Sequence, residues 1–339
     1  MKVLITGSEG FIGGYIVEKL LNDGHTVVGV DNYSKYGKVV RSFHENDNYL
    51  FTEGDAKDTE LLKKLLEGCD HFIANAALIG GISLFHEYAY DLLAENERIL
   101  ASSFDAAIDS FKNNKGLKKI TVMSSSMVFE STTEYPTPEG NQFKCAPPLS
   151  TYGFQKLATE YWAKGAFEQY KLPFTVIRPF NCIGIGETRA IHDKDVMSGN
   201  IKLAMSHVIP DLVQKIAKGQ DPLHILGQGN QIRHYTHGRD IARGIVLSLE
   251  HKNAINNDFN ISTEISTTVL ELAKLIWERL NDTPFNYVHD DPFKYDVQKR
   301  VPDVTKAKKL LNFEAEIGLD EALDEVIPWI KKEIESGVL

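Results

Sequence analysis

Two residues near the middle of the chain have the types and the spacing of a catalytic base. Tyr152 and Lys156 are four residues apart, so on a helix both side chains lie on one face. A free phenol titrates at about pH 10, and an ammonium held nearby favours the phenolate and lowers that pKa. The pair is therefore expected to take a proton from a substrate hydroxyl. The same spacing also fits a surface aromatic residue beside a solvated lysine, so the interpretation depends on companions elsewhere in the chain.

The serine run Ser124–Ser126 is the first companion. It follows an expected strand at residues 118–123 and precedes Tyr152 by about 25 residues. A serine hydroxyl at the carboxyl end of a strand would face a ligand crevice and bond the reacting oxygen during proton transfer. The alternative is that these serines cap a turn or a helix.

A glycine-rich turn near the start of the chain is the second companion. Gly7, Gly10 and Gly13 follow a short apolar strand, and a helical pattern, a second strand and then Asp31 come after them. This order favours a dinucleotide site, because glycines admit a pyrophosphate to the positive end of a helix. Asp31 would accept hydrogen bonds from a ribose diol and repel a 2′-phosphate, which favours NAD over NADP. A glycine turn with a capping acid is the alternative.

Strands and helices alternate over about 180 residues around these motifs. The alternation predicts an α/β fold with a parallel, doubly wound sheet, whose ligands bind at the carboxyl ends of the strands. There Asp55 would bind an adenine amino group or cap its own loop, and the small residues of Asn75-Ala76-Ala77 would let a flat cofactor lie close. The expected elements are strands at 3–6, 26–30, 49–52, 71–74 and 118–123 with a sixth from 175, and helices at 59–66 and at 92–111, which carries Asn96.

The alternation stops after residue 180, which predicts a second, smaller unit. We expect residues 1–180 to form a Rossmann domain, to which 235–262 would return with a further strand. Residues 181–234 and 263–339 would form a mixed α/β domain that closes the substrate side of the crevice. Its expected elements are a loop at 187–200 and helices near 210, at 269–280 and at 319–332.

Two arginines in the second unit have the chemistry to bind an anionic substrate. Arg233 follows a glycine-rich turn and could grip a diphosphate, and Arg300 lies in a charged stretch. Each could instead form a surface salt bridge. His234, His237 and Asp240 have the types of metal ligands, but we expect the histidines to support a loop and no metal to bind.

The composition is that of an ordinary globular protein. The chain has 339 residues, 42% hydrophobic and 25% charged, and its net charge of -10 argues against a nucleic-acid partner. No apolar run is long enough to span a bilayer, and no signal peptide is expected before the first strand. Three widely spaced cysteines, Cys69, Cys145 and Cys182, fit neither a disulfide framework nor a zinc site. We therefore expect a cytoplasmic protein with no membrane partner.

Together these motifs resemble the extended short-chain dehydrogenase/reductase superfamily, in its NAD-dependent nucleotide-sugar epimerase/dehydratase branch, over nearly the whole chain. The resemblance implies a catalytic triad of Ser125, Tyr152 and Lys156, where Ser125 is chosen because Val128-Phe129 stands for the branch's usual Val-Tyr. It implies NAD binding by Gly7, Gly10, Phe11, Ile12, Gly13, Asp31, Asn32, Asp55, Ala56, Ala76, Ala77 and Asn96, together with Tyr152 and Lys156. The segments 178–181, 208–210 and 233–237 are similar to its sugar-nucleotide segments, which implies substrate contacts from Ser126, Asn181, His207, Val208, Arg233 and Arg300.

The resemblance also implies a reaction. In this branch the tyrosine takes a proton from a sugar hydroxyl, most often at C4, while hydride passes to the nicotinamide. Dehydratases of the branch carry an Asp-Glu pair directly after the catalytic serine or threonine, where this chain has Ser126 and Met127. Neither side chain works as an acid or a base at neutral pH, which favours an epimerase of a nucleotide-diphosphate sugar. A dehydratase, a keto-sugar reductase and a non-catalytic NAD- and nucleotide-binding subunit are the alternatives.

A few positions depart from the pattern of the branch. Glu130 replaces the usual glycine after the Val-Tyr pair, and His207 stands where many relatives have asparagine. Arg300 resembles an arginine that serves the sugar-acid carboxylate in decarboxylases, so it marks a uronic-acid substrate, a phosphate contact or neither. Relatives pair through helices near 92–111 and 152–168, and we expect a homodimer that contributes to cell-surface polysaccharide synthesis.

Overall fold

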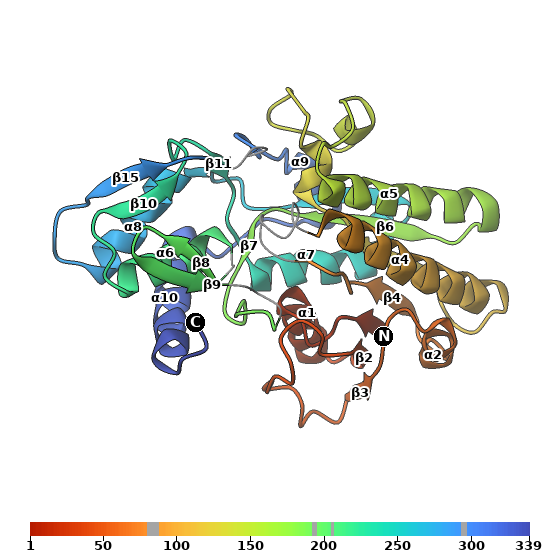
Figure 1. Cartoon of the computed structure of the whole chain (residues 1–339). Coiled ribbons are helices and arrows are strands. Elements are labelled where there is room, and N and C mark those ends of the chain that lie inside the picture. Colours follow the sequence, from red (N-terminus) through yellow and green to blue (C-terminus); the bar gives the residue numbers. More distant parts are fainter. Residues whose placement is uncertain (80–87, 192–194, 205–206, 293–296) are drawn as a thin grey trace.

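A seven-stranded parallel sheet forms the centre of the larger part of the molecule (Figure 1). The computed structural model describes residues 1–79, 88–191, 195–204, 207–292 and 297–339. The strand order is β13-β6-β5-β4-β1-β2-β3, so the direction of winding changes between β1 and β4. The strands are β1 (Lys2–Thr6), β2 (Thr26–Asp31), β3 (Tyr49–Glu53), β4 (His71–Ala74), β5 (Lys119–Met123), β6 (Phe174–Pro179) and β13 (Asn257–Ile261). A change of direction in a doubly wound sheet opens a ligand crevice at the carboxyl ends of the strands.

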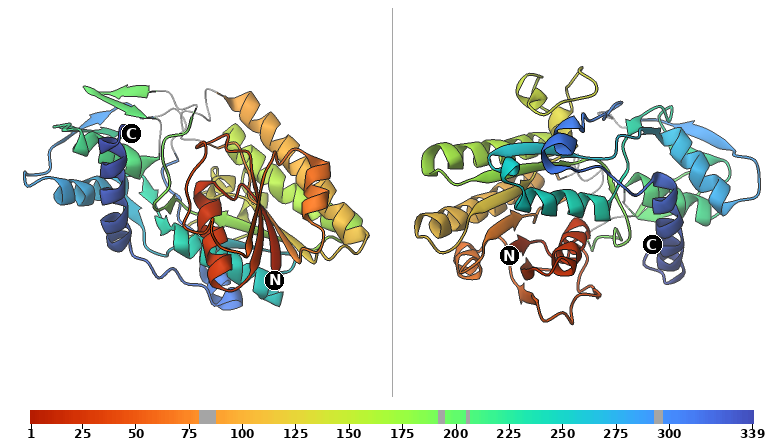
Figure 2. Two further views of the ribbon diagram at one scale, coloured as in Figure 1. Left: turned by 90° about the horizontal axis from the view of Figure 1, so that it is seen from below. Right: turned by 180° about the vertical axis from the view of Figure 1, so that it is seen from behind.

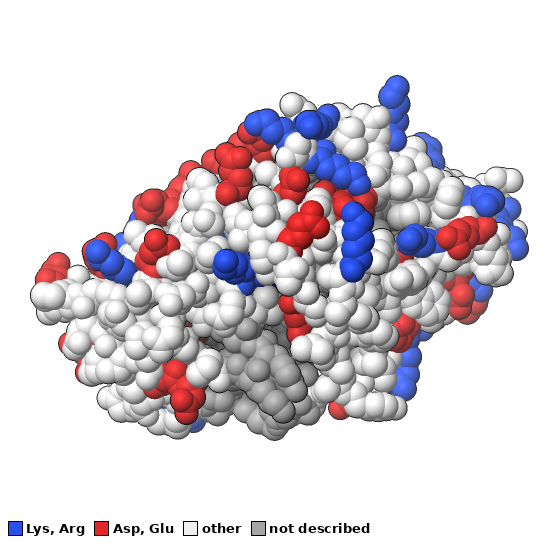
Figure 3. Space-filling model, turned by 90° about the horizontal axis from the view of Figure 1, so that it is seen from above, with Lys and Arg blue, Asp and Glu red and all other residues white. Residues whose placement is uncertain are grey.

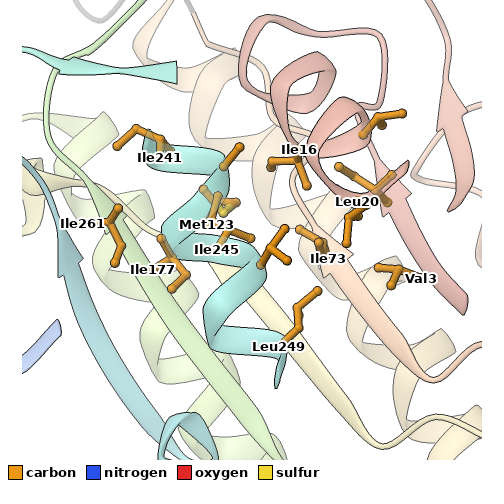
Figure 4. Close-up of a cluster of buried hydrophobic side chains, with 14 of the residues drawn as sticks. Val3, Ile16, Leu20, Ile73, Met123, Ile177, Ile241, Ile245, Leu249 and Ile261 are labelled. Carbon is orange, nitrogen blue, oxygen red and sulfur yellow. The ribbon is translucent and has the colours of Figure 1, made fainter. Parts of the chain in front are cut away.

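Helices cover both faces of this sheet, which explains why its inner strands are apolar on both sides. One face carries α1 (Phe11–Asn22), α7 (Gly238–Glu250) and α9 (Thr305–Leu311), and the other carries α2 (Thr59–Leu65), α4 (Ala89–Lys112) and α5 (Thr151–Tyr170). Figure 2 shows α1 and α4 on opposite sides of the sheet. Alternate residues of one strand enter different cores, because Val3 and Ile5 pack in the cluster of α1 and α7 while Leu4 packs in the cluster of α4. Figure 4 shows Val3 in the first cluster, together with Leu20 of α1 and Leu249 of α7.

A third hydrophobic cluster builds the smaller part of the molecule. Its helices are α6 (Val208–Ala217), α8 (Val269–Leu280) and α10 (Leu319–Glu335), and they pack beside the parallel pair β10 (Leu223–Leu226) and β15 (Tyr287–Asp290). The remaining short elements are β7 (Cys182–Ile183), β8 (Asp195–Ser198), β9 (Ile201–Ala204), β11 (Ile232–Arg233), β12 (Thr236–His237) and β14 (Thr267–Thr268), with the 3₁₀ turns η1 (Ser126–Phe129), η2 (Asn141–Phe143) and η3 (Lys252–Ala254). Among the described residues, none of the helices combines the length and the apolar character that crossing a bilayer requires.

The C-terminal third of the chain returns twice from the smaller part to the larger part. β13 pairs with β6 and extends the sheet, as the expected return of residues 235–262 requires. The chain returns again at α9, whose Ala307 and Leu311 pack in the cluster of α1 and α7. The sequence analysis assigned this segment to the smaller unit, because its amphipathic pattern does not say which core it faces.

The expected loop at 187–200 contains β8, which forms an antiparallel hairpin with β9. The two-domain division stays a proposal, and the separate clusters support it.

Candidate functional site

A cavity of about 990 Å³ lies at the carboxyl ends of the strands and extends to the smaller part of the molecule. It brings together residues from both ends of the chain. Of the predicted site residues, its lining includes Gly7, Gly10, Phe11, Ile12, Gly13, Asp31, Asn32, Asp55, Ala56, Ala76, Ala77, Ser125, Ser126, Tyr152, Lys156, Asn181, His207, Val208, Arg233 and Arg300. Asn96 lies behind the cavity wall, where its amide donates to the carbonyl of Leu78 at 2.9 Å and accepts from the Leu78 N–H at 2.7 Å. Asn96 therefore holds Leu78, a residue of the cavity lining, in place.

The glycine turn has no room for side chains. A Cβ on Gly13 would lie 1.9 Å from the Gly7 carbonyl oxygen, and a Cβ on Gly7, whose φ is +71°, would lie 3.0 Å from Cα of Ala76. The turn and the small residues after β4 therefore leave the backbone bare at the start of α1. Such a bare backbone beside a helix N-terminus fits a pyrophosphate.

Asp31 lies at the end of β2, beside this turn. Its carboxylate accepts hydrogen bonds from the N–H groups of Glu9, at 3.1 Å, and Tyr33, at 2.8 Å. Burial raises the pKa of Asp31, and the two backbone hydrogen bonds oppose that shift. The carboxylate is thus held in place at the position where a ribose diol is expected.

Glu9 is a buried residue of the turn that the sequence analysis missed. Its carboxylate accepts from the Tyr49 hydroxyl at 2.6 Å and lies 2.9 Å from His44 Nε2. The Arg41 guanidinium donates to the Glu9 carbonyl at 2.7 Å. The segment after β2 is therefore bonded to Glu9 of the glycine turn by three side chains, those of Arg41, His44 and Tyr49. A charged residue inside an otherwise small-residue turn was the available signal in the sequence.

Tyr152 and Lys156 lie on one face of α5, as their spacing predicted. Ser150 caps this helix by accepting from the Gly153 N–H at 3.0 Å. The Lys156 ammonium lies 5.9 Å from the centre of the Tyr152 ring and donates to the Met123 carbonyl at 3.0 Å. Burial lowers the pKa of Lys156 to about 8.

The phenol differs from the sequence prediction in its ionisation. Burial raises the pKa of Tyr152, whereas a hydrogen bond with Ser125 and the positive charge of Arg300 oppose that shift. The expected lowering by Lys156 does not dominate, because both side chains are buried and the phenolate loses solvation. Ser125 caps η1 by accepting from the Met127 N–H at 3.2 Å. Ser125 therefore caps a turn and also bonds the phenol, and its contact with a reacting oxygen stays a prediction.

Glu130, which departs from the branch pattern, supports the start of α5. Its carboxylate accepts from the Ser150 hydroxyl at 2.6 Å and from the Ser150 N–H at 3.2 Å. A negative charge at a helix N-terminus is favourable, so Glu130 stabilises the turn that precedes Tyr152. Met127 packs with Leu92 against the Tyr152 ring, and Ile79 and Val297 border this cluster.

Backbone pairing brings Arg233 and Arg300 together in the lining of the cavity. The Ile232 N–H donates to the Gln298 carbonyl at 2.8 Å, and the Arg300 N–H donates to the Ile232 carbonyl at 3.1 Å. Both arginines lower the pKa of Tyr235, whose burial raises it, and Arg300 also acts on Tyr152. Two positive charges therefore line the cavity, and that of Arg300 acts on the phenol.

The other predicted substrate contacts come from loops. Asn181 has a positive φ of 35°, and its side chain donates to the His234 carbonyl at 3.4 Å. His207 directly precedes α6, at a position where its side chain makes no capping bond, and it pairs through Nδ1 with the buried carboxylate of Glu187. Residues 80–87, which follow Leu78 and Ile79 of the cavity lining, lie outside the described residues.

His234, His237 and Asp240 each have a structural partner. His234 Nδ1 bonds the Thr263 carbonyl at 3.0 Å, and His237 caps α7 by accepting from the Arg239 N–H at 3.1 Å. Asp240 accepts from the N–H groups of Glu316 and Ile317 at 3.0 and 2.9 Å. In each of these bonds the side chain of His234, His237 or Asp240 is paired with a backbone group of the protein.

Comparison with known proteins agrees with this geometry. Residues 3–262 match the model of the NAD dependent epimerase/dehydratase family. The chain belongs to this family. It is 27% identical to the UDP-glucuronate 4-epimerase of Thermodesulfobacterium geofontis, over 98% of this chain and 97% of that protein. It is 28% identical to a UDP-N-acetyl-alpha-D-glucosaminuronate decarboxylase of Bacillus cytotoxicus, over 99% of each.

Solved structures show the same architecture. The UDP-glucose 4-epimerase of Thermotoga maritima, determined with UDP-glucose, is 29% identical and superimposes with a TM-score of 0.80 over 98% of this chain and 100% of that chain. The cofactor of the family is NAD, and the residues of this chain fit it. The bare glycine turn accommodates a pyrophosphate, and the held carboxylate of Asp31 suits a ribose diol.

Proposed function

We propose that this family member is an NAD-dependent epimerase that inverts C4 of a nucleotide-diphosphate sugar. The observation that carries the proposal is one cavity in which Ser125, Tyr152 and Lys156 meet the glycine turn at one end and Arg233 at the other. Ser126 and Met127, the residues after Ser125, supply no carboxyl group, which supports an epimerase over a dehydratase.

Each residue of the proposed triad has a separate task. Tyr152 takes the proton of the sugar hydroxyl, and Ser125, already bonded to the phenol, holds the same oxygen. Lys156 places a positive charge beside the phenolate. NAD, when bound, would accept hydride from the sugar carbon and return it. Met127 and Leu92 keep water from the phenol ring.

Arg300 supports a narrower proposal for the sugar. Arg300 lines the cavity and its positive charge acts on Tyr152, which supports a place for it near the proposed base. An arginine there suits a carboxylate. We propose that the sugar is a uronic acid, and Arg233 would then hold the diphosphate.

Proton NMR of the purified protein with a panel of nucleotide sugars and no added NAD tests this function. The panel pairs each neutral sugar with its uronic acid and includes several nucleotide bases. Ring couplings that change to those of the C4 epimer, without accumulation of reduced cofactor, are the expected result. Loss of water or of carbon dioxide would overturn the epimerase. Equal turnover of a neutral sugar and its uronic acid would overturn the role of Arg300.

We also propose a homodimer that pairs through α4 and α5. A hollow of about 730 Å³ lies between these helices, and Phe154, Tyr161 and Trp162, which line it, are 48%, 57% and 36% exposed. Exposed aromatic side chains on one face are typical of an interaction site. Tyr161→Asp should halve the mass in sedimentation equilibrium, and an unchanged mass would contradict this interface.

We place the enzyme in the cytoplasm, making sugars for cell-surface polysaccharide. Its three free cysteines suit a reducing compartment. The face in Figure 3 carries acidic and basic side chains interspersed, which offers little to a nucleic acid.

A further inference from the structure

A buried carboxylate next to the proposed triad takes no part in the chemistry described above. Glu160 lies on α5 one turn after Lys156 and two turns after Tyr152, so the three residues share one side of the helix. The side chain of Glu160 is 2% exposed and accepts four hydrogen bonds. The donors are the Ser124 hydroxyl at 2.7 Å, Gln142 Nε2 at 2.8 Å, and Nε and Nη2 of Arg178 at 2.7 Å each.

The charges continue from Glu160 across the sheet. Arg178 on β6 is fully buried, and its Nη2 also donates to Asp258 on β13 at 2.7 Å. The other oxygen of Asp258 accepts from the Lys306 ammonium on α9 at 2.5 Å. Lys306 is 27% exposed, so the series runs from the interior to the surface. We call Glu160, Arg178, Asp258 and Lys306 the charge chain.

The charge chain touches the backbone that carries the triad. Ser124 precedes Ser125, and its hydroxyl lies 3.4 Å from the Lys156 carbonyl as well as 2.7 Å from Glu160. The Arg178 guanidinium lies 5.3 Å from the centre of the Phe129 ring, which belongs to the turn that Ser125 caps. The carboxylate of Glu160 is thus connected with the end of β5 and the helix α5 through Ser124, and with the turn η1 through Arg178.

Net stability is a weak reason for such an arrangement. Burying a charge pair loses solvation that the attraction only partly returns, and apolar residues of similar volume would fold as well. Fixed, directional, charge-assisted hydrogen bonds instead define geometry. Proton transfer needs that geometry, since a displacement of about 1 Å can cost about 100-fold in rate.

We propose that the charge chain positions Tyr152, Lys156 and Ser125 for proton transfer, with Glu160 as its inner end and Lys306 as its outer end. The proposal rests on the proposed function for its kinetic test. The four residues are positioning residues that need not touch substrate or cofactor. It follows that Lys306, 150 residues after Lys156 in the sequence, affects the chemistry of a site that it does not line.

The test compares Glu160→Gln, Lys306→Met and Lys306→Arg with the wild-type protein. Glu160→Gln should lower kcat by about 10- to 100-fold and leave KM within about threefold, because the reacting groups move while the binding contacts stay. Lys306→Met should lower kcat by about two- to fivefold, and Lys306→Arg should restore it because it keeps the charge. In Glu160→Gln the pH at which kcat rises should also shift, since the surroundings of the phenol change.

A control variant separates positioning from stability. Asp240 is likewise a buried carboxylate paired with an arginine, at 2.8 Å from Arg243 Nη2, but it lies on α7 and does not line the cavity. Asp240→Asn should lower the melting temperature and leave kcat and the pH profile unchanged.

A second measurement needs no substrate. Tyrosinate absorbance in a pH titration, taken as the difference between each background with Tyr152 and the same background with Tyr152→Phe, isolates the ionisation of Tyr152. A shifted Tyr152 titration in Glu160→Gln supports the positioning role of the charge chain. It does so even if the protein turns over no nucleotide sugar, a result that would contradict only the proposed epimerase. Wild-type kcat, pH profile and titration in a folded Glu160→Gln would overturn it. If Glu160→Gln does not fold, the same three unchanged readouts in Lys306→Met would overturn it.

Discussion

Two buried lysines lie at opposite ends of strand β5. Lys119 begins the strand and donates to the Ser248 carbonyl at 2.5 Å, and Lys156 reaches its other end and donates to the Met123 carbonyl at 3.0 Å. Burial lowers the pKa of each to about 8. Only Lys156 lines the cavity, where it lies beside Tyr152, whereas Lys119 packs beneath α7.

The difference shows that a perturbed pKa does not by itself mark a site. A lysine whose pKa falls from 10.5 to about 8 loses about 3 kcal/mol of stability to burial of its charge. At the carboxyl end of the sheet, the loss of stability from burying Lys156 occurs beside a phenol, a serine and the bare glycine turn. At the amino end it accompanies the Ser248 carbonyl and the buried His71, whose pKa Lys119 helps to lower. Proximity to an open cavity separates the two lysines.

The largest expected effect contrasts two tyrosines of α5. Tyr152→Phe should lower turnover by about 10²- to 10⁴-fold, because the general base is lost, while NAD still binds. Tyr170→Phe, at the far end of the same helix, should leave both unchanged, since its hydroxyl accepts from Gln169 and does not line the cavity. Turnover by NMR and NAD binding by calorimetry check the pair, and retained turnover in Tyr152→Phe would remove the assigned base.

Substituting the two lysines sharpens the comparison directly. Lys156→Met should lower turnover about 100-fold, and Lys119→Met should leave it unchanged. Both variants should raise the free energy of unfolding by about 1–2 kcal/mol at pH 7, because relief of charge burial exceeds the loss of one hydrogen bond. Urea denaturation measures this. Reduced activity in a folded Lys119→Met would end the contrast between the two ends of β5.

Two aspartates at opposite edges of the sheet provide the next contrast. Asp31→Ala should weaken NAD about 10- to 100-fold and NADP far less, because it removes the expected ribose acceptor. Asp70, at the amino edge, likewise accepts a backbone N–H, that of Lys2 at 2.8 Å. Asp70→Ala should not change the affinity for either dinucleotide. An unchanged preference in Asp31→Ala, measured by titration, would mean that another residue holds the ribose.

The smallest effect is a dependence of stability on pH. A folded-state pKa of about 8, below the unfolded value of 10.5, means that the unfolded chain binds more protons between these values. Lysine burial therefore costs stability below pH 8, and the cost disappears as pH rises toward 10.5. The advantage of Lys119→Met should shrink by about 1 kcal/mol per pH unit above pH 8. An advantage that stayed constant up to pH 10 would contradict charge burial as its cause.

The central sheet was predictable because its signals are local. Apolar runs, glycine turns and amphipathic helices repeat along the sequence, and a parallel sheet places the ends of its strands at one edge. Those rules bring Gly7, Asp31 and Tyr152 into one cavity without knowledge of any long-range contact. Element boundaries differ by only a few residues, as where α4 begins at Ala89 and not at 92.

The remainder depends on contacts between segments far apart in the sequence. Asn96 was expected at the cofactor, but both of its amide atoms bond Leu78. The pKa of Tyr152 was expected to fall, but the depth of its burial comes from the tertiary fold. Glu9 and Glu160 are buried and Glu130 is half-buried, and their partners lie 18 to 40 residues away in the sequence. A solvated carboxylate is the ordinary expectation for such residues.

The late position of α9 in the chain has a consequence for biosynthesis. A ribosome completes β1 to β6 before it makes Asp258 and Lys306, and residues 298–300, which pair with Ile232, also come late. Strands β1 to β4 have their sheet neighbours within the first 180 residues, so they can pair during translation. The core beside α1 is completed only when α7 and α9 have been made. A nascent chain can therefore pair the strands around its glycine turn before that core and the charge chain are complete.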